Sequence, residues 1–320
     1  MSRVSIVIAT HDRADLLARA LSSVFAQDMT DLDVIVVDDG STDHTREILE
    51  RVVDDRLTVL RHERNRGVRA AKNTGLDHVT GEWFTFLDDD DEIVPHALST
   101  MLAVPEAVDR AITAVTCNCV DSQTGAFTGR GLTHDQWLDE ATRRRCCRGE
   151  FWGITQTALL GELRFNERVR LLDVLWLKIG ARARRYYIHQ GLRLYHTEGT
   201  DRVTHGMTAV TAPDRYDEFV ALLDEEQEYL RLLRALDRDG YRRLLGRAAY
   251  AFVLRGDRSR AASASRLLGE SGVNPWWIAS VAGLRAGPRL LRGSAATLSG
   301  GKRLWRAGKA IRGRERRRGR

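Results

Sequence analysis

Four consecutive aspartates, Asp88–Asp91, follow an apolar run that ends in Phe86 and Leu87. Adjacent carboxylates repel one another and burial penalises their charge, so ionised side chains in this position need a nearby positive charge. A hard divalent cation meets that need, because Mg²⁺ and Mn²⁺ take oxygen ligands, commonly one or two carboxylates together with substrate phosphates. An isolated acidic run is more often a solvated turn. Its position behind an apolar run favours a metal site here.

A second acidic pair has the same setting. The apolar run Val34–Val37 ends in Asp38 and Asp39, followed by Gly40 and Ser41. Two expected buried strands therefore deliver carboxylates at their carboxyl ends, and open α/β sheets bind their ligands at that edge.

The elements that position these carboxylates alternate between strand and helix patterns over the first 120 residues, which is typical of βαβ units. Strands are expected at Val4–Ala9, Asp33–Val37, Leu57–His62, Trp83–Leu87 and Ile112–Cys119. Helices are expected at Ala14–Gln27, Thr42–Val53, Val68–His78 and Pro95–Met101, with Ser41 or Thr42 capping the second. The pattern predicts an α/β fold with a doubly wound, Rossmann-like sheet.

Four segments are expected along the chain. Residues 1–120 form the α/β half, and the irregular stretch 121–212 completes the same domain on its substrate side. Residues 213–300 form a helical extension, with helices at Tyr216–Leu236 and Arg242–Leu254. Within it, Trp277, Leu284 and Leu291 fall on one helical face. Residues 301–320 form a basic tail.

Charge is concentrated in that tail. Lys302–Arg320 holds ten Lys or Arg and one Glu, a net +9, whereas the whole chain carries +6 and the remainder therefore −3. A mildly acidic body argues against nucleic-acid binding. The tail, which includes Trp305, is a candidate contact with an anionic membrane surface, and disorder is its alternative.

No segment has the pattern of a signal peptide or of an apolar membrane span, so we expect a cytoplasmic protein, with the tail as its candidate attachment to the inner face of the membrane. The cysteines fall as Cys117-x-Cys119 and Cys146-Cys147, which is not zinc-site spacing. Reduced thiols are expected.

Several short motifs occur in an order typical of one enzyme family. They are Val4–Arg13, Val37–Asp43, Asn65-Arg66-Gly67, Asn73-x-Gly75, Gly81-Glu82-Trp83 and Asp88–Asp90. By this ordered set, which covers residues 4–91 and continues more weakly to about residue 205, the chain resembles a family 2 glycosyltransferase of the GT-A fold. The resemblance implies a mixed GT-A sheet and the transfer of a sugar from a nucleotide diphosphate.

The resemblance also implies a nucleotide site. Its expected members are Thr10, Asp12, Asp39, Arg66, Lys72, Asp88 and Asp89. Lys72 departs from the family, which more often has Arg there, and lysine lacks the planar fork that pairs bidentately with phosphate. Asp39 has an alternative role as a carboxylate at a helix N-terminus.

The implied metal site holds Mn²⁺ or Mg²⁺. Asp88 and Asp90 match the family's Asp-x-Asp motif, while Asp91 is expected to support the ligands or cap a helix. His196 best fits the late histidine that family members add, and His205 is the alternative.

The resemblance places the catalytic base at Asp173, which would take the proton from the acceptor hydroxyl as it attacks. Leu172 stands where the family usually has Glu, and a plain helix cap is the alternative for Asp173. Trp152 and Gly153 are expected on the acceptor side, with a buried core tryptophan as the alternative.

The sequence thus indicates a metal-dependent inverting glycosyltransferase that uses a nucleotide-sugar donor, with UDP expected, and a glycan or lipid-linked acceptor in polysaccharide or cell-envelope biosynthesis. A sugar nucleotidyltransferase is disfavoured because Thr10–Arg13 lacks a glycine-rich phosphate loop. A receiver domain is too short for this chain. A non-catalytic sugar-nucleotide-binding protein that retains the fold is the alternative.

Overall fold

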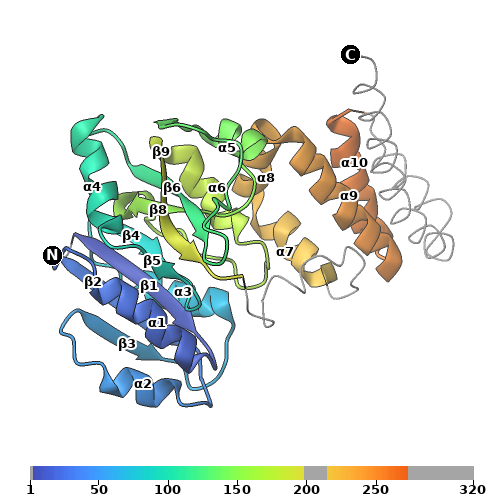
Figure 1. The fold of residues 1–320 in the computed structure, drawn as a ribbon. Helices are drawn as coiled ribbons and strands as arrows, with labels where there is room; N and C mark the ends of the chain where they lie inside the picture. The colour runs from blue at the N-terminus through green and yellow to red at the C-terminus, as the bar shows by residue number, and fades with distance from the viewer. Residues whose placement is uncertain (1–2, 198–214, 273–320) are drawn as a thin grey trace, which may run out of the picture. The chain divides into compact units, whose positions relative to one another are not determined.

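A computed structural model describes residues 3–197 and 215–272 (Figure 1). The chain divides into two compact units, Met1–Arg202 with Ala235–Asp237, and Val203–Arg234 with Arg238–Arg320. The expected Trp277–Leu291 face, the basic tail and His205 lie outside the described residues.

The first unit is built on one sheet in the order β3-β2-β1-β4-β8-β6-β9-β5, with β7 paired to β9. The strands are β1 (Val4–Thr10), β2 (Leu32–Asp38), β3 (Leu57–Arg61), β4 (Trp83–Phe86), β5 (Glu92–Ile93), β6 (Ala114–Asp121), β7 (Gln136–Trp137), β8 (Phe151–Gln156) and β9 (Arg185–Tyr195). Strands β3, β2, β1 and β4 are parallel, whereas β8 runs antiparallel to both β4 and β6. The expected mixed sheet is confirmed.

Helices cover both faces of this sheet, which explains the near-continuous apolar sequence of its central strands. The helices of this unit are α1 (Ala14–Phe25), α2 (Thr45–Arg51), α3 (Val68–Leu76), α4 (Ala97–Ala107), α5 (Glu140–Cys146) and α6 (Asp173–Arg182). On one face Ile6 and Ile8 join a core with Leu17 of α1. On the other face Val7 joins Leu175 of α6. Alternate residues of β1 therefore serve opposite cores, and the doubly wound architecture follows.

Several expected helix bounds differ from the structure, and two of the differences have a clear cause. Helix α2 begins at Thr45, where Asp43 Oδ1 accepts a hydrogen bond from the Thr45 amide at 2.9 Å, so neither Ser41 nor Thr42 caps it. Helix α4 continues past Met101 and through Pro105, because its apolar side stays buried to that point.

The segment that looked irregular in the sequence contains much of the sheet. Strand β9 alone spans 11 residues and pairs with β5, β6 and β7. Strands β8 and β6 lie between β4 and β9 in the sheet, so this segment extends the sheet on the side of β4 opposite β1.

The second unit is helical in its described part, with α7 (Tyr216–Glu225), α8 (Gln227–Leu236), α9 (Arg238–Arg255) and α10 (Arg258–Glu270). The expected continuous helix Tyr216–Leu236 is interrupted at Glu226. Among the described residues, no helix combines the length and apolarity needed to cross a membrane.

Candidate active site

The carboxyl ends of β1, β2 and β4 meet at one edge of the sheet (Figure 1). Thr10 pairs in register with Asp38, and the Asp39 amide donates to the Thr10 carbonyl at 2.9 Å. The Leu87 amide donates to the Val7 carbonyl at 3.1 Å, so the acidic run emerges beside β1. The two acidic motifs thus share one edge, as the sequence predicted.

Three basic side chains neutralise the acidic run. Lys72 Nζ lies 3.0 Å from Asp88 Oδ1. Arg13 Nη1 lies 2.9 Å from Asp89 Oδ1 and 3.2 Å from Asp90 Oδ2. The third is Arg193 on β9, whose Nη2 lies 2.7 Å from Asp88 Oδ2.

Arg193 also binds Asp91, which makes a buried ion pair behind the exposed part of the run. Its Nε donates to Asp91 Oδ2 at 2.7 Å, and the side chains are 8% and 1% exposed. The His196 amide donates to Asp91 Oδ1 at 3.0 Å. Asp91 therefore orients Arg193, and Arg193 holds Asp88 in place.

Burial and charge act on these carboxyls in opposite directions. Burial raises the pKa of Asp89 to about 6 despite the nearby Arg13, and it raises the pKa of Asp91 to about 6 despite Arg193. The Lys72 ammonium, followed by Arg193, holds the pKa of Asp88 well below its usual range. Asp88 is thus the carboxyl most strongly kept ionised at this edge.

The expected metal ligands are not gathered into one group. His196 Nε2 lies 2.7 Å from Glu92 Oε1, and both oxygens of Asp88 bind basic side chains. Within residues 3–197 and 215–272, no three His, Cys, Asp or Glu side chains converge as a metal site. A cation held mainly by substrate phosphates needs only one or two protein carboxylates. Asp90 fits that requirement, since its side chain is 33% exposed and its Oδ2 lies 3.2 Å from Arg13 Nη1.

Asp39 fixes the loop before α3. Its Oδ1 accepts from His62 Nδ1 at 2.6 Å and from the Arg66 amide at 2.9 Å, while Oδ2 accepts from the Gly67 amide at 2.7 Å. The Arg66 side chain is half exposed, with Nη2 3.8 Å from Glu167 Oε1. A nucleotide contact by Asp39 or Arg66 stays a prediction.

Asp12 joins the loops that follow β1 and β2. It adopts a left-handed backbone with φ of 52°, and its Oδ1 accepts from the amides of Thr42 at 2.7 Å and Asp43 at 3.2 Å. The Thr42 amide accordingly lowers the pKa of Asp12. Thr10 is buried at the end of β1. Contacts of Asp12 and Thr10 with a nucleotide also stay predictions.

The expected base, Asp173, opens helix α6. Leu172 occupies the N-cap position, so Asp173 lies in the first turn and does not cap the helix. Arg144 Nη1 lies 2.8 Å from Oδ1 and 2.9 Å from Oδ2 of Asp173. The carboxylate is 35% exposed, and this arginine competes with an incoming hydroxyl for its oxygens.

The expected acceptor-side pair is structural. Trp152 is 5% exposed, and its indole Nε1 donates to the Phe86 carbonyl at 2.8 Å, so its ring cannot cover a sugar. A Cβ on Gly153 would lie 2.0 Å from the Val115 carbonyl oxygen, so this glycine permits close strand pairing. Assigning Trp152 and Gly153 to the acceptor was therefore incorrect.

Arg193, Arg13 and Arg144 were not expected in the site. Each is separated from its aspartate by 29 to 105 residues. One signal in the sequence could have identified Arg193: it is a charged residue between Leu192 and Leu194 in a strand pattern. A charged residue on a buried strand needs a partner of opposite charge.

This sheet order, with an aspartate run following β4, is the GT-A arrangement of sugar-transferring enzymes. Consistently, the model of Glycosyl transferase family 2 matches residues 5–167. The chain belongs to this family and is a glycosyltransferase.

Two relatives illustrate the similarity. The chain is 34% identical over 215 residues to the GalNAc(5)-diNAcBac-PP-undecaprenol beta-1,3-glucosyltransferase of Campylobacter jejuni, covering 64% of this chain and 68% of that protein. It is 35% identical over 109 residues to the succinoglycan biosynthesis protein ExoO of Rhizobium meliloti, which covers 34% of this chain and only 31% of that relative.

Two solved structures share the fold. S. aureus TarS 1-349 in complex with UDP-GlcNAc superposes with a TM-score of 0.61 at 19% identity, over 84% of this chain and 91% of that one. Mannosyltransferase PcManGT from Pyrobaculum calidifontis, in complex with GDP-Man and Mn²⁺, gives 0.51 at 23% identity, over 95% and 82%.

Proposed function

We propose that this glycosyltransferase transfers a sugar from UDP, with inversion and with Mn²⁺ or Mg²⁺, to a glycan or lipid-linked acceptor. The observation that carries the proposal is the Asp88–Asp91 run at the carboxyl edge of the sheet, held by Lys72, Arg13 and Arg193. The name of the Campylobacter jejuni relative supports a diphosphate-linked lipid acceptor and a role in glycan assembly. The UDP-GlcNAc bound to TarS supports a UDP donor.

The donor diphosphate would lie over the acidic run, where the three cations lower the cost of bringing two sets of negative charge together. Asp90 would hold the cation, with Asp88 joining it if the diphosphate draws Lys72 or Arg193 away. When bound, such a cation neutralises charge on the departing diphosphate. Lys72 also lies 5.1 Å from the centroid of the Phe86 ring, which limits its movement.

Asp173 would act as the base on the acceptor. Arg144 holds the carboxylate in place at the start of α6, and it must share the oxygens when the hydroxyl arrives. Proton transfer by a positioned carboxylate contributes a factor of roughly 10² to 10⁴ in rate.

Calorimetric titration of UDP, with EDTA or with Mn²⁺, tests the donor and metal assignments together. We expect Mn²⁺ to strengthen UDP binding in the wild type and to have no such effect in Asp90→Asn. The exposed Asp55→Asn is the matched control and should behave as the wild type. Equal affinity with and without Mn²⁺ would refute metal dependence, and tighter binding of GDP than of UDP would refute the donor.

A separate measurement tests the alternative that the protein binds sugar nucleotides without transferring the sugar. Release of UDP from a panel of UDP-sugars, at a rate that Asp173→Asn reduces, would exclude it. UDP binding without any release from the panel would favour it.

A further inference from the structure

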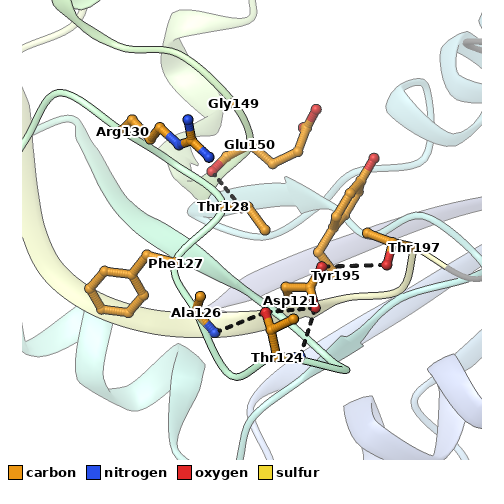
Figure 2. Close-up of a pocket in the computed structure, with 10 residues that line it drawn as sticks. All are labelled: Asp121, Thr124, Ala126, Phe127, Thr128, Arg130, Gly149, Glu150, Tyr195 and Thr197. Carbon is orange, nitrogen blue, oxygen red and sulfur yellow. Dashed lines mark hydrogen bonds between the residues drawn. The ribbon is translucent and has the colours of Figure 1, made fainter.

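A cavity of about 370 Å³ lies at the carboxyl ends of β6 and β9 (Figure 2). Its walls come from the hairpin that follows β6, from Gly149 and Glu150, and from the end of β9. The volume falls within the range of small-molecule sites, about 300 to 1,000 Å³. None of the residues assigned above to the donor lines it.

The cavity walls are fixed by local hydrogen bonds. Asp121 Oδ1 accepts from the Thr124 amide at 2.8 Å, which shapes the hairpin. The Thr128 hydroxyl donates to the Glu150 carbonyl at 3.2 Å and joins the two walls (Figure 2). Gly149 has φ of +85°, and a Cβ there would lie 2.1 Å from the Thr128 carbonyl oxygen. The absence of a side chain at Gly149 thus lets the two walls of the cavity approach each other closely.

Two opposite charges in the cavity remain available to a ligand. The side chains of Arg130 and Glu150 both line it, and neither makes a hydrogen bond or an ion pair in the part of the chain that the structure describes. Both are exposed. A guanidinium offers donors only and a carboxylate offers acceptors only, so together they match hydroxyl groups, which do both.

Tyr195 connects this cavity to the acidic run. Its ring lines the cavity, and the Arg193 guanidinium carbon lies 5.8 Å from the ring centroid. Residues 193 and 195 share one face of β9, because side chains alternate along a strand. Since Arg193 binds Asp88, the cavity adjoins the expected position of the donor diphosphate.

We propose that this cavity binds the sugar ring of the acceptor that the enzyme glycosylates, an inference that rests on the function proposed above. The expected donor residues lie at the ends of β1, β2 and β4 and in or just before α3, whereas this cavity lies over β6 and β9, farther along the sheet. Asp121 and Glu150 outnumber Arg130, so the cavity disfavours a diphosphate and fits a neutral ring. Glu150 and Arg130 bind the ring hydroxyls, and Tyr195 contacts an apolar face of the ring.

The test is saturation-transfer NMR with the methyl α- and β-glycosides of glucose, galactose, N-acetylglucosamine and N-acetylgalactosamine, in the presence of UDP and Mn²⁺. We expect at least one glycoside to bind the wild type, and Glu150→Gln and Arg130→Ala each to weaken it at least about tenfold. Gln123→Ala and Arg110→Ala are matched controls, exposed and outside the cavity, and should retain binding.

Calorimetry on the same variants separates the outcomes. Unchanged affinity for UDP and for UDP-sugars, together with lost glycoside binding, supports the acceptor cavity. Weakened binding of UDP-sugars with unchanged UDP binding would show that the cavity holds the donor sugar and overturns the inference. Absence of glycoside binding to the wild type, or equal binding by all variants, overturns it too. Failure of the wild type to bind UDP instead contradicts the proposed function.

Discussion

The buried ion pair of Asp91 with Arg193 supports the acidic run at the edge of the sheet. Both side chains are buried, and the arginine extends from the pair to Asp88 at the exposed edge. A buried ion pair is costly to form, because both ions lose water, but removing one partner leaves the other buried and uncompensated. Its contact with Asp88 indicates that it serves to fix the position of that carboxylate.

Arg193→Ala should therefore destabilise the protein by roughly 3 to 5 kcal/mol. The exposed ion pair of Arg3 with Glu106 provides the comparison, since its loss in Arg3→Ala should cost about 1 kcal/mol or less. Urea unfolding of the two variants, followed by circular dichroism, measures the difference. Equal costs would mean that Arg193 is not needed to compensate Asp91.

Asp173→Asn should lower the rate of UDP release from the true donor by roughly 10² to 10⁴, because the amide cannot accept the hydroxyl proton. UDP affinity should stay within about twofold, since Arg144 of α5, which binds Asp173, is not among the expected donor residues. Rates and calorimetry on the same preparation check both statements. Loss of UDP binding in this variant would assign Asp173 to the donor site.

At this scale the sequence pointed to the acids and to Lys72, but not to Arg13 or Arg193. Asp88 and Asp90 could be predicted because the acidic run and the apolar strand before it are adjacent in the sequence. The pairing of Arg193 with Asp88 spans 105 residues, and only the fold brings them together. Trp152 was misassigned because its side chain points into the core, which a single tryptophan in a sequence does not reveal.

Among the elements, the loops after β1, β2 and β3 set the shape of the donor edge. Gly40 illustrates their tight packing, because a Cβ there would lie 2.5 Å from the Arg64 carbonyl carbon. Its φ of +71° is also unfavourable for any other residue. The loop after β2 therefore contacts the loop after β3 without room for a side chain.

Gly40→Ala should destabilise the protein by at least about 2 kcal/mol more than Gly125→Ala. Gly125 is a close control, since its φ of +68° is similar and a Cβ there would meet nothing within 4 Å. Chemical denaturation of both variants gives the comparison. Similar losses would show that the strand-end loops separate readily and that packing at Gly40 is not limiting.

The strands and helices of the first 120 residues were largely predictable, because their hydrophobic patterns reflect two cores on opposite faces of one sheet. The boundaries of the helices were harder to predict. Helix α2 starts at Thr45 because Asp43 binds the first helical amide, and the sequence pattern alone does not show which of several polar residues does so. Strand β9 was missed because Arg185, His189 and Arg193 interrupt its apolar pattern, and the partners of the two arginines lie on distant elements.

For the whole molecule, the uneven charge is the main property that the sequence establishes directly. The 19 residues from Lys302 carry +9, and the rest of the chain is slightly acidic. Such a segment is attracted to anionic lipid by about 1 kcal/mol for each basic residue near the surface. This attraction would keep the enzyme close to a lipid-linked acceptor.

Deletion of Lys302–Arg320 should abolish sedimentation with liposomes that contain anionic lipid, while UDP binding is retained. Binding of the intact chain should weaken as salt rises from 0.05 to 0.5 M, because the attraction is screened. Liposomes of neutral lipid are the control. Unchanged sedimentation after the deletion would place any membrane contact elsewhere in the chain.

The position of Tyr195, between Arg193 and the cavity, has a consequence for the order of substrate addition. In the proposed site, a donor diphosphate would compete with Asp88 for Arg193, and a shift of that guanidinium would change the surface against which Tyr195 rests. The acceptor cavity would then reach its working shape only after the donor has arrived. We expect sequential kinetics with the donor first, in which UDP inhibits competitively against the sugar nucleotide and noncompetitively against the acceptor.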